Sequence, residues 1–108
     1  MRVELLYTDD DPGYMTARQN LVEVLGEDAF ETPIQMIAVG SRQDAELLAF
    51  PGSPTIRIDG VDIDPDGASG IGLELRTYRD SEGGSSVPSK ALIRAAVDRA
   101  RGWSHARR

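Results

Sequence analysis

The sequence predicts a single α/β domain with the element order β-α-β-α-β-β-α, in which a mixed four-stranded sheet carries helices on both faces. Two observations support this prediction: apolar runs alternate with amphipathic segments, and Gly- or Pro-containing breaks separate them. Strands joined through a helix are parallel and need a right-handed crossover, whereas the last two strands, joined by a short connection, are antiparallel. With 108 residues in all, one domain is expected over residues 1–101, followed by a basic C-terminal tail at 102–108.

The first half of the chain contains two strand–helix pairs. The first strand is expected at Val3–Tyr7, a short apolar run typical of a strand that is covered on both faces. The next helix is expected to end near Gly26, and its apolar residues recur at three- and four-residue spacing, at Tyr14, Ala17, Leu21 and Leu25. The second strand is expected at Ile34–Val39. The second helix begins at Ser41, because Ser41 and Asp44 form a capping-box pattern.

The second half contains a hairpin, an edge strand and the last helix. Thr55–Asp59 alternates as a strand does, and Asp59-Gly60 favours a two-residue hairpin turn, since both central positions need positive φ. Residues 61–64 are the expected return arm of this hairpin. The alternating run Leu73–Arg79 predicts the edge strand. A Gly/Ser-rich loop over residues 81–86 then leads to the last helix, which begins at Pro88-Ser89.

Composition and charge exclude several classes of function. A net charge of −6 argues against nucleic acid and anionic membranes as partners, because phosphate binding needs clustered Lys and Arg. The chain has no cysteine, so it has no disulfide, thiolate metal site or thiol nucleophile. No cofactor is predicted. The acidic N-terminus does not resemble a signal peptide, and no apolar run approaches the roughly 20 residues of a membrane span, so a cytoplasmic location is expected.

Two motifs, DPGY at Asp11–Tyr14 and GSPTIRIDG around Pro54, resemble elements of the thioredoxin fold. In that family the first strand ends in a C-P-x-C or C-P-x-x loop that opens the first helix, and a cis-proline before the third strand faces this loop. The resemblance covers nearly the whole chain. More narrowly, LLYTDDDPGY, GSPTIRIDGVDID and GLELRTY are similar to segments of small bacterial thioredoxin-like proteins, some of them labelled alkylmercury-lyase-like.

The resemblance implies the scaffold of that family without its chemistry. Asp11 and Leu75 stand where the relatives carry cysteine, and both disulfide exchange and carbon–mercury cleavage need sulfur. The resemblance thus implies a redox-inactive domain that binds a protein segment or a small ligand in the cleft between the Pro12 loop and the Pro54 turn. A cis Ser53–Pro54 bond would expose backbone groups that can pair with an extended peptide. The implied binding residues are Asp11, Pro12, Tyr14, Ser53, Pro54 and Thr55.

The sequence itself offers a structural explanation for Asp11. Directly before Pro12, it is expected to be the N-cap of the first helix, with the proline at the first helical position. Its carboxylate would accept N–H groups of the first turn and interact with the helix dipole, which stabilises the helix by roughly 1 kcal/mol. Asp9 and Asp10 are expected to be charges on a solvated loop, with cation binding as the alternative.

Two alternative functions remain open. Tyr14 lies on the apolar stripe of the first helix, where packing is expected, but its phenol could also polarise a ligand thiol or carbonyl. The chain could then be a cysteine-independent enzyme, such as a transferase-like activity on a low-molecular-weight thiol, with Tyr14 or Thr8 assisting. It could also be a subunit that acts through homo-oligomerisation, using a sheet edge or a helix face.

The acidic run DIDPDG contains an incomplete calcium motif. Asp62, Asp64 and Asp66 match positions one, three and five of a calcium loop, and a glycine follows at position six. Position twelve is Leu73, however, and the glutamate that should stand there comes one residue late, at Glu74. No helix is expected on either side of the run. A solvated acidic hairpin is therefore expected rather than a metal site.

Overall fold

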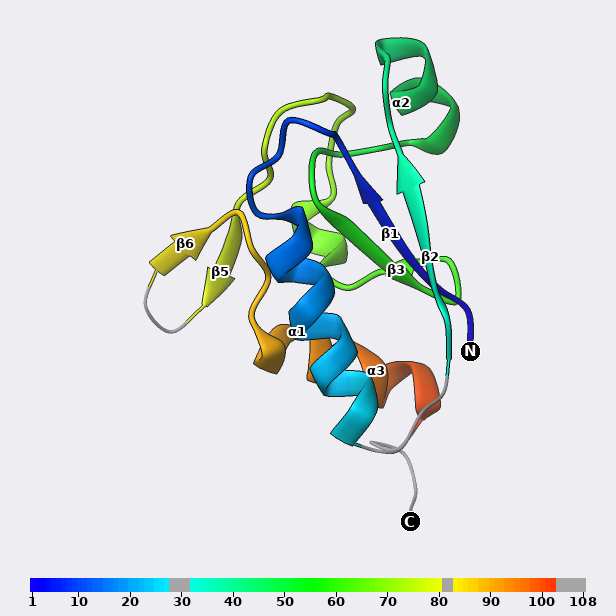
Figure 1. Cartoon of the computed structure of the whole chain (residues 1–108), viewed down its shortest axis with the longest axis vertical. Helices are drawn as coiled ribbons and strands as arrows, with labels where there is room; N and C mark the ends of the chain where they lie inside the picture. Colours follow the sequence, from blue (N-terminus) through cyan, green and yellow to red (C-terminus); the bar gives the residue numbers. More distant parts are fainter. Residues whose placement is uncertain (28–31, 81–82, 103–108) are drawn as a thin grey trace.

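The sheet has four strands in a mixed arrangement, as the sequence predicts (Figure 1). The computed structural model describes residues 1–27, 32–80 and 83–102. The strand order is β2-β1-β3-β4. β1 and β2 are parallel, and β3 is antiparallel to both of its neighbours. The strands are β1 (Val3–Tyr7), β2 (Ile34–Ala38), β3 (Thr55–Ile58) and β4 (Val61–Asp62).

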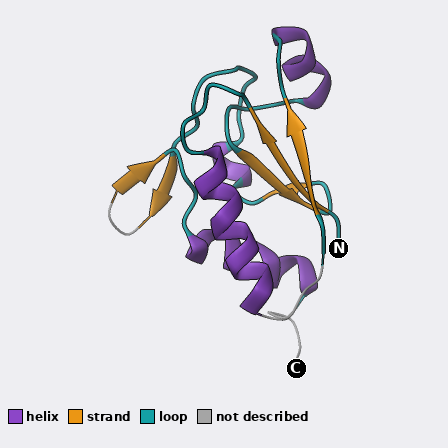
Figure 2. Cartoon of the chain, viewed as in Figure 1, coloured by secondary structure: helices purple, strands orange, loops and turns teal. Residues whose placement is uncertain are grey.

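Helices cover both faces of the sheet, because successive side chains of a strand point to opposite faces. α1 (Tyr14–Glu27) and α3 (Lys90–Arg101) lie side by side and pack on the face that carries Leu5 (Figure 2). α2 (Arg42–Leu48) belongs to the second cluster, in which Leu6 of β1 packs with Val39, Ala45 and Phe50. The larger cluster consists of Val3, Leu5, Ala17, Leu21, Val24, Leu25, Ile56, Ile58, Ile63, Tyr78, Ile93, Ala96 and Val97.

Local sequence signals produce the expected helix starts and hairpin turn. Ser41 caps α2 by accepting a hydrogen bond from the Asp44 N–H at 3.1 Å, and Ser89 caps α3 in the same way. Asp59 and Gly60 have φ angles of 53° and 83°. The predicted two-residue turn between β3 and β4 is therefore confirmed.

The predicted edge strand at Leu73–Arg79 is wrong. The tight turn at residues 59–60 brings β4 back beside β3, so β4 takes the edge position. In the described part of the chain, residues 73–77 form no strand. Their one β-type pairing there is an isolated parallel bridge between Leu75 and Ser53. A separate hairpin then forms from β5 (Tyr78–Asp80) and β6 (Gly83–Ser85), so part of the expected Gly/Ser loop is a strand.

The last described helix, α3, ends at Arg101, where the domain was expected to end. Gly102 follows with a φ of 73°, a left-handed conformation that glycine adopts readily after a helix. The expected basic tail begins at this point, but residues 103–108 lie outside the described residues. None of the helices in the described part of the chain combines the length and hydrophobicity needed to cross a membrane.

Candidate functional site

The loop after β1 and the turn before β3 lie at the same end of the sheet (Figure 1). Buried hydrogen bonds join them. The Ser53 hydroxyl donates to Asp11 Oδ2 at 2.6 Å, and Ser53 Oγ accepts from the Thr8 N–H at 3.0 Å. The other carboxylate oxygen, Asp11 Oδ1, accepts from the Gly13 N–H at 2.8 Å. The two halves of the predicted site are therefore in direct contact, and Asp11 is only 2% exposed.

The predicted N-cap position of Asp11 is wrong by a short distance. α1 begins at Tyr14 rather than at Pro12, so Asp11 precedes the helix by three residues. Its carboxylate still accepts a hydrogen bond from the N–H of Gly13, the residue directly before the helix, and so forms a short Asx turn. Its second oxygen binds Ser53, which is 42 positions away in the chain. Helix-capping rules cannot predict this second partner, because they are local.

The turn before β3 is buried and is supported by Tyr78. The Ser53–Pro54 bond is cis, as the resemblance implies. The Tyr78 hydroxyl donates to the Pro54 carbonyl oxygen at 2.5 Å. Burial raises the pKa of the Tyr78 phenol above its ordinary value, since the charged form would lose its hydration. Tyr78 therefore stays protonated at neutral pH and remains a hydrogen-bond donor to the turn.

Arg76 organises the same region, although it was not predicted as a site residue. Its side chain is 2% exposed and forms a bidentate ion pair with Asp62, 2.8 Å from Nη1 to Oδ2 and 3.2 Å from Nη2 to Oδ1. Nη1 also donates to Thr55 Oγ1 at 3.1 Å. The guanidinium lies 4.5 Å from the centroid of the Tyr78 ring. Alternation along residues 73–79 places Arg76 and Tyr78 on one face. This is the sequence signal that could have identified both as residues of the site.

Residues 71–76, here called the covering segment, occupy the backbone groups that were expected to bind a peptide. The Ser53 N–H donates to the Glu74 carbonyl at 2.9 Å, and the Arg76 N–H donates to the Ser53 carbonyl at 2.9 Å. Gly52 permits this approach, because its φ is 128° and a Cβ there would lie 2.9 Å from the Glu74 carbonyl oxygen. The expectation that the cis turn exposes the Ser53 groups is therefore wrong, since the chain's own segment pairs with them.

Most of the predicted binding residues are inaccessible in this arrangement. Four of the six are buried, namely Asp11, Ser53, Pro54 and Thr55. Tyr14 is half-buried and stacks on Tyr7, with ring centroids 4.3 Å apart, so the expected packing role is confirmed. Pro12 is exposed. Any ligand at this end of the sheet therefore meets the surface around these residues and not the turn itself.

The acidic run that begins at the end of β4 supplies the ion pair with Arg76. Asp62 Oδ1 accepts the Asp64 N–H at 2.8 Å in addition to the guanidinium, and the Asp64 carbonyl accepts from Arg76 Nη2 at 3.2 Å. Asp66 is exposed in the 3₁₀ helix η1 (Pro65–Gly67). Within the described ranges, no three acidic, histidine or cysteine side chains converge as a set of metal ligands. The run therefore differs from a calcium loop.

The covering segment exposes three apolar side chains, and one of them, Leu73, lies beside an acidic loop. Ile71, Leu73 and Leu75 are 41%, 36% and 51% exposed. Asp9 and Asp10 are exposed, as predicted for a solvated loop. A cavity of about 270 Å³ joins these two features and is lined by Thr8, Asp9, Asp10, Val39, Gly40 and Leu73. Thr8 is buried there, and its hydroxyl has no hydrogen-bond partner in the described part of the chain.

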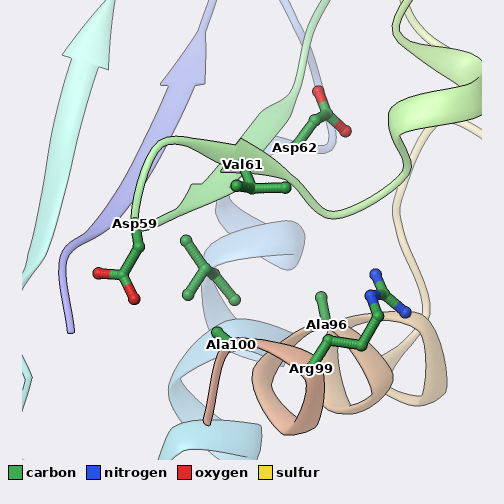
Figure 3. A pocket seen from close by; sticks show the side chains of 7 residues that line it. Asp59, Val61, Asp62, Ala96, Arg99 and Ala100 are labelled. Carbon is green, nitrogen blue, oxygen red and sulfur yellow. The ribbon is translucent and has the colours of Figure 1, made fainter. Parts of the chain in front are cut away.

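A second cavity, of about 390 Å³, lies between the β3–β4 hairpin and α3 (Figure 3). Figure 3 shows Val61 of β4 and Ala96 of α3 facing it from opposite sides. Its charged residues already bind protein atoms, since Asp59 accepts from the Arg2 N–H and Arg99 donates to the Ile63 carbonyl. The remaining lining is mainly apolar, and none of the predicted binding residues lies in it.

The site offers groups for recognition. The Asp11 carboxylate is occupied by two hydrogen bonds and the Tyr14 ring by stacking. The exposed groups nearby include leucine, isoleucine and carboxylate side chains. Such groups can bury apolar surface and attract positive charge. No family model, curated protein or solved structure matches the chain.

Proposed function

We propose that the chain is a redox-inactive thioredoxin-like domain that binds a protein segment or a small ligand where the Pro12 loop meets the Pro54 turn. The strand order β2-β1-β3-β4, with β3 antiparallel to β1, supports the thioredoxin-like topology. The buried hydrogen bond between Ser53, in the turn before β3, and Asp11, in the loop after β1, supports it further. Because Asp11 stands where the relatives carry cysteine, the domain has no thiol for electron transfer there.

The observation that carries this proposal is the contrast between the two sides of the covering segment. Its inner side pairs with Ser53 and fills the predicted cleft. Its outer side presents Ile71, Leu73 and Leu75, three apolar side chains within five residues, all exposed. Neighbouring exposed apolar side chains are typical of a binding surface. The binding surface therefore lies on the outer side of the covering segment, one layer outside the buried turn.

Peptide selection tests this proposal. The immobilised full chain is presented with a random-peptide phage library, and selected peptides are titrated by calorimetry. Leu75→Asp is expected to weaken binding at least about tenfold, because it removes buried apolar area from the complex. Val61→Asp makes the same kind of change at a residue of β4 that is 61% exposed, and it is expected to leave the affinity unchanged.

A thermal-shift panel of reduced and oxidised glutathione, other small thiols and common metabolites tests the small-ligand part of the proposal. A ligand whose effect is lost in Leu75→Asp and kept in Val61→Asp supports it. A thiol whose effect depends on Tyr14 and not on Leu75 would support the transferase-like alternative. If neither the library nor the panel yields a ligand, the proposed binding function is contradicted.

A further inference from the structure

We propose that the partner is an extended, basic protein segment that adds as a strand to the free edge of the covering segment at Leu75. This inference rests on the proposed function and specifies its ligand. It follows from three observations on the outer side of the covering segment: an unpaired backbone edge, a row of apolar side chains, and a concentration of carboxylates.

The backbone edge at Leu75 is open. Glu74 and Arg76 direct their backbone groups to Ser53, as the two 2.9 Å hydrogen bonds show. Successive residues of an extended chain direct these groups to opposite sides, so the N–H and C=O of Leu75 point away from Ser53. Neither has a backbone partner among the described residues. An unpaired edge of this kind can accept a further strand through main-chain hydrogen bonds.

Exposed apolar side chains stand at Leu75 and in the residues just before it. Ile71, Leu73 and Leu75 recur at every second residue, and each is more than a third exposed. Leu75 stands at the isolated bridge, whereas residues 73 and 74 form a bend. An added strand would therefore pair at Leu75, and its side chains next to that pairing would contact the exposed leucines. Main-chain hydrogen bonds would then supply part of the affinity, while alternate apolar side chains of the partner would supply selectivity.

Charge identifies the kind of segment that fits. The exposed carboxylates of Asp9 and Asp10 belong to the cavity that Leu73 also lines, and Glu74 is exposed in the covering segment itself. Within the described residues, none of the three has an ion-pair partner. The cavity of about 270 Å³ can receive a Lys or Arg side chain beside Asp9 and Asp10. A second copy of the chain, with net charge −6, would meet this face with repulsion.

The charge requirement is tested with the peptides selected on the full chain. They are expected to carry a net positive charge and to bind more weakly as salt is raised. Asp9→Asn combined with Asp10→Asn is expected to lower their affinity about tenfold, since two partly exposed ion pairs are lost. The control, Asp66→Asn combined with Asp98→Asn, removes the same amount of charge at two other positions of the chain. It is expected to change the affinity less than about twofold.

The strand pairing is tested by N-methylation along one selected peptide. Methylation of amides that face Leu75 should lower affinity at least about tenfold, and methylation of the alternate amides less than about twofold. Selected peptides that are neutral or acidic, or that show no alternation, would overturn the inference and leave the proposed function standing. Light scattering that shows a dimer, abolished by Leu75→Asp, would also overturn it. Failure to select any peptide would remove the basis of the inference.

Discussion

Two aspartates of the described residues, Asp11 and Asp62, are bound in different ways. Asp11, in the loop after β1, receives only neutral donors, the Ser53 hydroxyl and the Gly13 N–H. Asp62, in β4, receives the buried guanidinium of Arg76 in a bidentate ion pair. A hydrogen bond to a charged group contributes roughly 1.5–3 kcal/mol, whereas removing one partner of a buried ion pair costs about 3–5 kcal/mol.

The difference shows how each contact contributes to the site. The Asp11 contact joins the loop after β1 to the turn before β3. The Arg76 contacts join the covering segment both to β4 and, through Thr55, to the start of β3. The covering segment is therefore firmly attached although it has almost no regular secondary structure. A firmly attached segment can present a fixed edge to a partner.

The largest effect is expected for Arg76→Ala. It leaves the Asp62 carboxylate without its cation and should lower the free energy of unfolding by about 3–5 kcal/mol. Urea denaturation measures the change. Arg94→Ala is the control, because it removes an ion pair with Glu27 in which both side chains are more than 40% exposed, and it should cost no more than about 1 kcal/mol. Equal effects of the two changes would contradict the importance given to the buried pair.

Asp11→Ala is expected to have the next largest effect. It removes the acceptor of both the Ser53 hydroxyl and the Gly13 N–H, so it should destabilise the fold by roughly 2 kcal/mol, more than a helix cap alone. Thermal and urea melts measure this loss. Asp9→Ala, at an exposed position of the same loop, should stay within about 0.5 kcal/mol of the parent chain. A loss of less than about 1 kcal/mol for Asp11→Ala would mean that the Ser53 contact adds nothing to stability.

Tyr78→Phe should cost about 1 kcal/mol at neutral pH, since it removes the donor to the Pro54 carbonyl. It should also change the pH dependence. Because burial raises the pKa of Tyr78 above its ordinary value near 10, the unfolded chain loses this proton first as the pH rises. The stability that Tyr78 contributes is thus complete below about pH 10 and declines above it. Urea melts between pH 8 and pH 11.5, roughly, should show a smaller decline for the phenylalanine variant.

The smallest effect, and one of opposite sign, is expected for Thr8→Val. The Thr8 hydroxyl is buried without a partner in the described part of the chain, so its replacement by a methyl group should be neutral or should stabilise the fold by up to about 1 kcal/mol. Differential scanning calorimetry resolves such a change. A clear destabilisation would mean that the hydroxyl has a partner in solution.

The parts of the fold that depend on neighbouring residues were predictable. The serine caps of α2 and α3 and the Asp59-Gly60 turn act over two to four residues, and a sequence pattern contains all of their members. The order of elements from β1 to β4 and the position of the last helix were also predictable, because hydrophobic periodicity reports which face each element buries. The separate β5–β6 hairpin was not.

The contacts that define the site were not predictable, because their partners are distant in the chain. Ser53 reaches Asp11 across 42 positions, and Arg76 reaches Thr55 across 21. The alternation in residues 73–79 predicted a strand with two kinds of face. It could not show that Arg76 and Tyr78 are buried and that the leucines are exposed, since that choice depends on acceptors supplied by β4 and by the turn.

Amide hydrogen exchange, resolved by NMR, tests most directly whether the covering segment pairs with Ser53 and leaves its own edge free. The structure predicts slow exchange for the Ser53 and Arg76 amides, which are both paired, and fast exchange for the Leu75 amide between them. A selected peptide should then slow Leu75 without accelerating the other two. If Ser53 and Arg76 exchange as fast as Leu75 in the free chain, the covering segment is open in solution and the Ser53 groups are available to a ligand, contrary to this account.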